Sequence, residues 1–207
     1  MGSKGYFQNV ATQWDRMRES FFPDVVRDRA LLIADVQPGR IAADLGAGSG
    51  FVTEGLLRKG LKVLAFDQSE AMLAVMKEKF GTAEGIEYHI GDAEHLPIPD
   101  ATVDYAFANM YLHHVESPSK TIREMARIVK NAGKVVITDL DEHSFEFLKV
   151  EHHDRWMGFK RDDIKEWMAE TGLKNVSVGC MGENCCAESS CGSERASVSI
   201  FVASGEK

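Results

Sequence analysis

A chain of 207 residues is long enough for one domain with a substantial core, and 44% hydrophobic with 27% charged residues is ordinary for a globular protein. The net charge of −8 disfavours nonspecific binding to nucleic acid or to an anionic membrane, so we expect a small-molecule partner and leave the oligomeric state open. The chain shows no apolar run of signal-peptide length at its start and no stretch of the roughly 18 apolar residues that span a membrane. We therefore expect a cytoplasmic protein.

Two amphipathic helices are predicted at the start of the chain. Apolar residues three or four apart indicate helices over residues 6–18 and 24–36, and Pro38-Gly39 then forms a turn. We expect residues 1–37 to form a helical cover over one end of the protein.

The most informative stretch follows this cover. The apolar run 41–43 predicts a buried strand, residues from Phe51 onward predict a helix, and a glycine-rich loop joins them. The loop holds Gly46, Gly48 and Gly50, with Asp44 two residues ahead of the first glycine. Glycines let a ligand lie against the main chain. The dinucleotide fingerprint Gly-x-Gly-x-x-Gly fails, because Phe51 and Thr53 stand where its third glycine is needed. Asp44 suits a ligand that carries an ammonium group.

This Asp-x-Gly-x-Gly-x-Gly pattern resembles that of class I S-adenosylmethionine-dependent methyltransferases, in particular the small-molecule branch that includes the quinone-biosynthesis enzymes. Three later stretches follow in the order that the resemblance implies. The strand 62–67 ends in Asp67, 21 residues after Gly46, near the spacing of an acid that binds ribose hydroxyls. The strand 86–90 leads to Asp92, which the resemblance assigns to the adenine amino group, with the backbone of Ala93 on a ring nitrogen. The strand 103–108 leads to Asn109. The predicted cofactor-binding residues are Asp44, Gly46, Ala47, Gly48, Gly50, Asp67, Gln68, Met72, Asp92, Ala93, Glu94 and Asn109.

The fold class follows from the alternation of strands and helices. Alternation predicts a parallel sheet with helices on both faces and with ligands at the carboxyl ends of the strands. Further helices are predicted over 70–80, 118–130, 144–156 and 161–171, and further strands over 135–139, 173–179 and 196–204. The resemblance implies an α/β, three-layer, Rossmann-like sandwich whose mostly parallel, seven-stranded sheet has the order 3-2-1-4-5-7-6 with strand 7 antiparallel. We expect a single domain over 1–207, with a helical insertion at 140–172 near the acceptor pocket.

Catalytic residues are expected after the fourth and fifth strands, whose tips border the acceptor pocket in this fold. His113 and His114 follow the fourth strand, and Asp141 and His143 follow the fifth. Histidine has a pKa suited to a general base near neutral pH, although a single histidine more often packs or caps. A sulfonium is a strong electrophile, so alignment of the acceptor can suffice without a base.

Four cysteines are clustered near the end of the chain: Cys180, Cys185, Cys186 and Cys191. If the last two strands form a hairpin, its connection, 180–195, places all four thiols over the acceptor pocket. Their spacing is not that of a zinc ribbon, but three thiolates could bind a soft metal or a metalloid. A redox-sensitive lid, or surface cysteines without a role, are the alternatives.

The sequence thus predicts an S-adenosylmethionine-dependent methyltransferase that acts on a small molecule, with a thiol or metalloid acceptor at the cysteines as one option. The alternative is a non-catalytic sensor that binds the cofactor or a metal. A dehydrogenase is disfavoured by Phe51 and Thr53.

Overall fold

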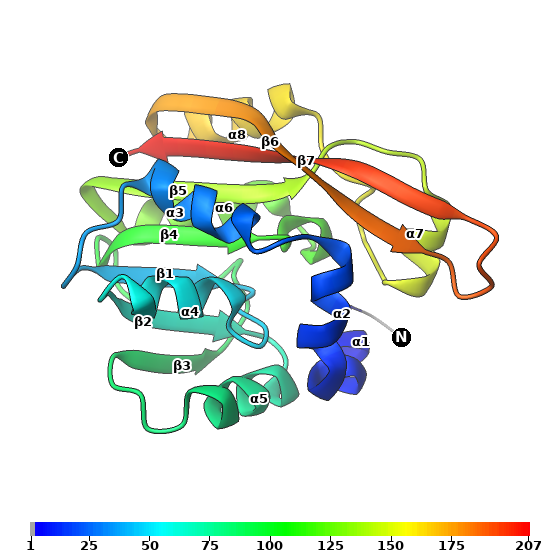
Figure 1. Cartoon of the computed structure of the whole chain (residues 1–207). Helices are drawn as coiled ribbons and strands as arrows, with labels where there is room; N and C mark the ends of the chain where they lie inside the picture. The colour runs from blue at the N-terminus through cyan, green and yellow to red at the C-terminus, as the bar shows by residue number, and fades with distance from the viewer. Residues whose placement is uncertain (1–2) are drawn as a thin grey trace.

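A computed structural model describes residues 3–207 and confirms the predicted fold class (Figure 1). The sheet is formed by β1 (Ile41–Leu45), β2 (Lys62–Asp67), β3 (Ile86–Ile90), β4 (Val103–Asn109), β5 (Val129–Leu140), β6 (Lys174–Glu188) and β7 (Arg195–Glu206). Its order is β3-β2-β1-β4-β5-β7-β6. The pairs among β1 to β5 are parallel, and β7 is antiparallel to both of its neighbours.

Helices cover both faces of the sheet because the central strands are apolar on both sides. Adjacent Ala42 and Ala43 of β1 are fully buried and belong to two different core clusters, one on each face. On one face pack α3 (Val25–Ala34), α4 (Phe51–Arg58) and α5 (Glu70–Phe80); on the other pack α6 (Pro118–Ile128) and α8 (Arg161–Glu170). This arrangement leaves the carboxyl ends of the parallel strands free for a site.

The N-terminal segment lies beside those carboxyl ends (Figure 1). The prediction of one continuous helix over 6–18 is wrong: α1 (Ser3–Val10) and α2 (Trp14–Phe21) are separated by the 3₁₀ turn η1 (Ala11–Gln13). Of the predicted cover over 1–37, residues 1 and 2 lie outside the described residues. Aromatic side chains from both short helices, such as Phe7 and Trp14, lie at the carboxyl ends of the strands.

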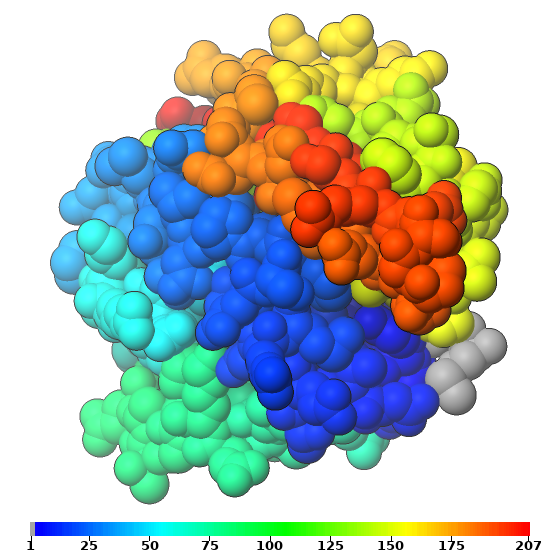
Figure 2. All heavy atoms as spheres, turned by 45° about the vertical axis from the view of Figure 1, so that its right-hand side comes forward, coloured from blue at the N-terminus to red at the C-terminus, as the bar shows by residue number. Residues whose placement is uncertain are grey.

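The C-terminal hairpin is longer than predicted. Strands β6 and β7 extend past the end of the sheet (Figure 1), and their far end lies next to the N-terminal helices and the 141–160 segment (Figure 2). The expectation that 180–195 is a loop is therefore wrong, because the ladder between the two strands resumes after a register shift between Cys180 and Asn184.

Two other elements, β5 and α7, differ from prediction. The strand β5 begins at Val129, so the end of the predicted helix and the following turn belong to it. The helix α7 covers only Glu146–Glu151, because the backbone N–H groups of Arg155 and Trp156 both donate to the carbonyl of His113 instead of continuing the helix. His113 itself lies in the 3₁₀ turn η2 (Leu112–His114). In residues 3–207, every helix is too short or too polar to cross a lipid bilayer.

Candidate cofactor and acceptor sites

The glycine loop between β1 and α4 needs glycine for two different reasons. Gly46 and Gly48 have φ values of +65° and +55°, which side chains rarely adopt, and a Cβ on Gly46 would overlap the ring of Tyr111. Gly50 also has a positive φ, of +94°, but a Cβ there would overlap the ring of Phe80 on α5. The first two glycines face a cavity, whereas Gly50 allows α4 and α5 to pack closely.

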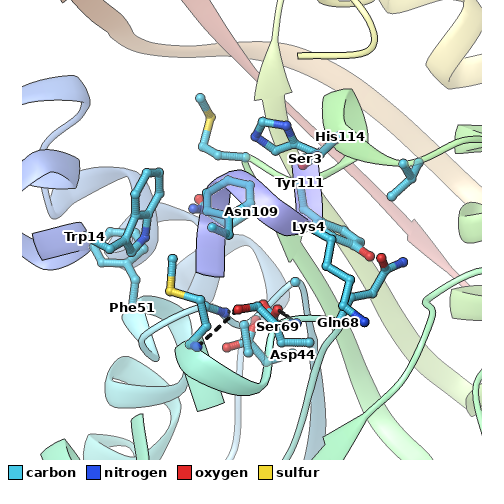
Figure 3. Close-up of a pocket in the computed structure, with 18 of the residues that line it drawn as sticks. Ser3, Lys4, Trp14, Asp44, Phe51, Gln68, Ser69, Asn109, Tyr111 and His114 are labelled. Atoms are coloured by element: carbon cyan, nitrogen blue, oxygen red, sulfur yellow. Dashed lines mark hydrogen bonds between the residues drawn. The ribbon is translucent and has the colours of Figure 1, made fainter. Parts of the chain in front are cut away.

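A cavity of about 240 Å³ lies along this loop. Its wall contains every predicted cofactor-binding residue except Gly50 and Ala93. Figure 3 shows Asp44, Gln68 and Asn109 around the same space, with Trp14 on one side and His114 on another. Residues from four strand ends thus meet at one place, as the order of the motifs predicts.

Asp44 is the most buried acid on the cavity wall, with 1% of its surface exposed. One carboxylate oxygen accepts hydrogen bonds from the backbone N–H and the hydroxyl of Thr53, at 2.9 and 2.6 Å. Burial raises the pKa of Asp44 to about 7, against the lowering effect of the Thr53 bonds. A buried carboxylate with few compensating bonds is a good partner for a ligand cation.

Asp67 is a second carboxylate on the wall of this cavity. Its two oxygens accept from the backbone N–H groups of Gly48 and Ser69, at 2.8 and 2.7 Å. Burial raises the pKa of Asp67, although these bonds oppose the rise. Asp67 therefore ties the glycine loop to the start of α5 while its carboxylate stays on the cavity wall.

The part of the cavity beyond Asp67 is lined by Asp92, Glu94 and Tyr111. Burial raises the pKa of Tyr111, as do the charges of Asp67, Asp92 and Glu94, and the backbone of Ala93 is hydrogen-bonded to its hydroxyl. The ring of Tyr111 lies over Gly46, so this side chain occupies part of the space between the glycine loop and Ala93. The predicted role of Ala93 requires that Tyr111 release this backbone group.

Sequence reasoning missed several wall residues. They are Ser3, Lys4, Phe7, Arg18, Phe22, Phe51, Val52, Ser69, Met110, Tyr111, Val115, Glu116 and Arg155. Arg18 is the most informative, because its guanidinium lies 4.4 Å from the Phe51 ring centroid and bonds Asp24 at 2.9 Å. An arginine at the end of the predicted amphipathic helix was the available signal in the sequence; the remaining residues carry no local pattern.

A second, smaller cavity adjoins the first. The two share wall residues Phe7, Trp14, Phe22, Met110 and His114. The rest of the second wall is mainly apolar or histidine, namely Tyr6, Phe21, His113, Leu140, Leu148, His152, Asp154, Cys185 and Ala187. It therefore combines the N-terminal helices, the 140–172 segment and the C-terminal hairpin.

Four buried polar side chains line or support this second cavity. The Nδ1 atom of His113 lies 2.6 Å from an Asp139 oxygen, and its Nε2 atom lies 3.9 Å from Asp154. Burial alone lowers the pKa of His113, but the charges of Asp139 and Asp154 and the Asp139 bond raise it to about 9. Burial raises the pKa of Asp154 to about 6. Burial and the charge of His113 hold the pKa of His114 well below its usual value.

The other two predicted catalytic residues lie outside both cavity walls. Asp141 accepts two hydrogen bonds from Arg161, at 2.7 and 2.6 Å. His143 accepts one from the backbone of Phe145 at 3.2 Å. This geometry argues against direct contact between either residue and a bound acceptor, because Asp141 fastens α8 and His143 fastens the segment before α7.

The expectation that all four thiols overhang the acceptor pocket is wrong. Cys180, Cys185 and Cys186 lie in β6, where neighbouring side chains point to opposite faces, and of these three Cys185 lines the second cavity. Cys180, Cys186 and Cys191 are exposed. Within residues 3–207, the one group of three or more histidine, cysteine, aspartate or glutamate side chains with metal-binding spacing is His113, His114 and Asp154.

Comparison with known proteins agrees with the fold. The family model described as a methyltransferase domain matches residues 43–137. The chain is 30% identical to the demethylmenaquinone methyltransferase of Thermobifida fusca, over 79% of this chain and 69% of that protein. It is 29% identical to the malonyl-[acyl-carrier protein] O-methyltransferase of a Marinomonas species, over 81% of this chain and 64% of that protein.

A solved structure extends the likeness to the whole fold. A chain from the complex between the Haloferax volcanii Trm112 methyltransferase activator and the putative methyltransferase superposes with a TM-score of 0.78 at 18% identity, covering 99% of this chain and 97% of that one. The fold and the glycine-loop cavity define a nucleoside-binding Rossmann-like protein. The chain belongs to the class I S-adenosylmethionine-dependent methyltransferases, among relatives that include the quinone-biosynthesis enzymes.

Proposed function

We propose that this protein transfers a methyl group from S-adenosylmethionine, bound in the first cavity, to a small apolar acceptor bound in the second. The observation that carries this proposal is the wall that the two cavities share. A methyl group can pass only between partners held in contact and in line. Adjoining cavities with a common wall supply that arrangement.

The chemistry of the first cavity orients the cofactor. The buried carboxylate of Asp44 attracts the ammonium group, and Asp67 accepts from the ribose hydroxyls. Asp92 and Glu94 would hold the adenine end, and Gln68, Met72 and Asn109 also line the wall of this cavity. At the methionine end, Arg18 lies close to Phe51 and is a cation available to the cofactor's carboxylate.

The second cavity selects the acceptor. Its aromatic and aliphatic wall favours a small apolar molecule, and its buried histidines favour one with a single polar heteroatom, such as a thiol, a phenol or a hydroquinone. His114 lines both cavities, so it is the side chain placed to contact the acceptor heteroatom. His113 holds a supporting position behind it, bonded to Asp139. A metalloid acceptor would meet one thiol here, that of Cys185.

Two measurements test this function. Calorimetric titration with S-adenosylmethionine should show binding much tighter than that of NAD. Release of S-adenosylhomocysteine should then depend on one member of a panel of thiols, phenols, hydroquinones and arsenite. Cofactor binding without turnover on any member would support the sensor, and binding no tighter than that of NAD would refute the cofactor assignment.

A further inference from the structure

The second cavity contains an arrangement that methyl transfer by itself does not require. Three potential ligand atoms, one each from His113, His114 and Asp154, lie within 4.8 Å of one another. The Asp154 oxygen is 3.9 Å from Nε2 of His113 and 3.8 Å from Nδ1 of His114. These separations are too long for hydrogen bonds. Atoms that ligate one tetrahedral ion at about 2.0 to 2.2 Å lie roughly 3.3 to 3.6 Å apart, so the three side chains would close by a few tenths of an ångström around an ion.

The Nδ1 atom of His114 is buried and has no hydrogen-bond partner among residues 3–207. Orphaned buried nitrogens are rare in folded proteins because each costs about 1 to 3 kcal/mol. The His114 ring is hydrogen-bonded to the backbone of His153, and since Nδ1 has no partner, this bond falls to Nε2. The lone pair of Nδ1 is thereby aimed at the space beside Asp154.

His113 also has one ring nitrogen held by a hydrogen bond and the other directed to the shared space. Its Nδ1 atom is bonded to Asp139 at 2.6 Å, which leaves Nε2 for the shared space. Histidines that ligate metals almost always bond their other ring nitrogen to a carboxylate or a backbone carbonyl. Both histidines here follow that pattern, one with each kind of partner.

The cluster is also fixed in position, and two carboxylates lie beside His113. Asp154 is held because the next two backbone N–H groups donate to the carbonyl of His113, at 2.9 and 3.1 Å. His113, Asp139 and Asp154 are all buried, with 5%, 0% and 6% of their surfaces exposed. The carboxylates of Asp139 and Asp154 both lie beside His113, and a divalent cation bound to the ring nitrogens would balance their charges.

We propose that His113 Nε2, His114 Nδ1 and the Asp154 carboxylate bind a divalent transition metal ion of the zinc class. Two imidazoles and one carboxylate form the ligand set of catalytic zinc sites that keep a position open. All three residues line the second cavity, so the open position faces the acceptor. Asp139 and the backbone of His153 are the supporting groups.

A metal ion at this position would restrict the acceptor to molecules that can ligate it, such as a thiol or a phenol. This inference about the acceptor rests on the proposed function. A thiol or phenol gives its proton to solvent and binds the ion as an anion, because coordination lowers its pKa. The anion's lone pair then forms the new bond to the methyl carbon as the sulfonium S–C bond breaks, leaving S-adenosylhomocysteine. Acceptors that cannot ligate the ion should be poor substrates.

Metal binding can be tested without any acceptor. The full chain, stripped with a chelator and then freed of it, should bind one equivalent of Zn²⁺ by calorimetry and give the visible absorption of tetrahedral Co²⁺ when Co²⁺ is used instead. Asp154→Asn should abolish the Co²⁺ spectrum, and Asp139→Asn should weaken Zn²⁺ binding by about 10- to 100-fold. Asp154 lies outside the cofactor cavity, so Asp154→Asn should still bind S-adenosylmethionine, which shows that it is folded.

Two controls separate this site from others. His95→Ala, an exposed histidine, should bind Zn²⁺ like the parent, and so should the variant in which all four cysteines are replaced by serine. Failure of the stripped protein to bind one equivalent, binding unaffected by Asp154→Asn, or binding lost on removal of the cysteines would each overturn the proposal. Cofactor binding tests the methyltransferase assignment separately, so the two can fail independently.

Discussion

Asp44→Asn is the most diagnostic substitution at the cofactor cavity because it should have opposite effects on stability and on binding. Burial raises the pKa of Asp44 from 3.8 to about 7. A tenfold change in a protonation equilibrium is about 1.4 kcal/mol, so keeping the carboxylate ionised costs the folded protein roughly 4 kcal/mol above pH 7. Asparagine removes this cost, and the shift already includes the hydrogen bonds from Thr53. We expect the variant to be about as stable as the parent at pH 4 and more stable by roughly 4 kcal/mol at pH 8, where the carboxyl group of the parent is ionised.

The sign of the pH dependence follows from the direction of the shift. Between pH 3.8 and about 7 the folded parent binds a proton that the unfolded chain has released, so its stability falls as pH rises through this window. The advantage of Asp44→Asn should therefore grow from near zero at pH 4 to its full value above pH 7. Chemical denaturation at both ends of the range measures it, with Asp162→Asn, an exposed acid on α8, as the control.

Binding should move the other way. Loss of an ion pair to the cofactor's ammonium group costs about 1.5 to 3 kcal/mol, which is roughly 10- to 150-fold in affinity. The parent should lose affinity below pH 7 as Asp44 takes up a proton, whereas Asp44→Asn should not show that loss. Calorimetric titrations with S-adenosylmethionine at pH 6 and pH 8 measure both. Equal affinity at pH 8, or an unchanged pH dependence in the variant, would refute the assignment of Asp44 to the ammonium group.

Three further predictions concern other parts of the molecule. Asp67→Ala should weaken S-adenosylmethionine binding by about 1 to 3 kcal/mol, measured by calorimetry, because it removes the ribose acceptor and the bond that holds Gly48; unchanged affinity would remove the ribose assignment. Gly46→Ala should lower thermal stability by about 1 to 2 kcal/mol and weaken cofactor binding, because its φ is +65° and its Cβ would overlap Tyr111; a variant as stable as the parent would contradict this geometry. Alkylation by iodoacetamide, followed by mass spectrometry, should modify Cys191 first and Cys185 last, because hydrogen bonds from Ser189 and Ser193 lower the pKa of Cys191 to about 7 whereas burial raises that of Cys185 to about 12; rapid modification of Cys185 would place it outside the cavity.

The cofactor half of the site was largely predictable because its parts are local in sequence. Each strand that runs into the cavity ends in a recognisable residue, so Asp44, Asp67 and Asp92 could be placed without any tertiary information. Parallel strands bring such ends to one edge of the sheet. Two predicted cofactor-binding residues, Gly50 and Ala93, do not line the cavity. Gly50 packs against Phe80, and the backbone of Ala93 is hydrogen-bonded to Tyr111.

The second cavity could not be predicted in the same way, because its wall is built by contacts between distant segments. The break between α1 and α2, the early end of α7 and the length of the hairpin all depend on tertiary packing that overrides local propensity. The helix predicted over 144–156 ends early because residues 155 and 156 bond to His113, some forty positions away. That contact also places Asp154 beside the two histidines.

The cysteines show why sequence proximity is a poor guide to a site on a strand. Adjacent Cys185 and Cys186 suggest a shared role in the sequence, yet the twofold periodicity of β6 turns one toward the cavity and the other toward solvent. His113 and His114 are also adjacent, but they lie in a 3₁₀ turn, where successive side chains can face one space, and their ring centroids are 4.0 Å apart. Two adjacent cysteines on a strand therefore point to opposite sides, whereas two adjacent histidines in a 3₁₀ turn lie together. For this reason the chemistry of the acceptor site follows from the histidine pair and Asp154, and Cys185 acts there as a single buried thiol.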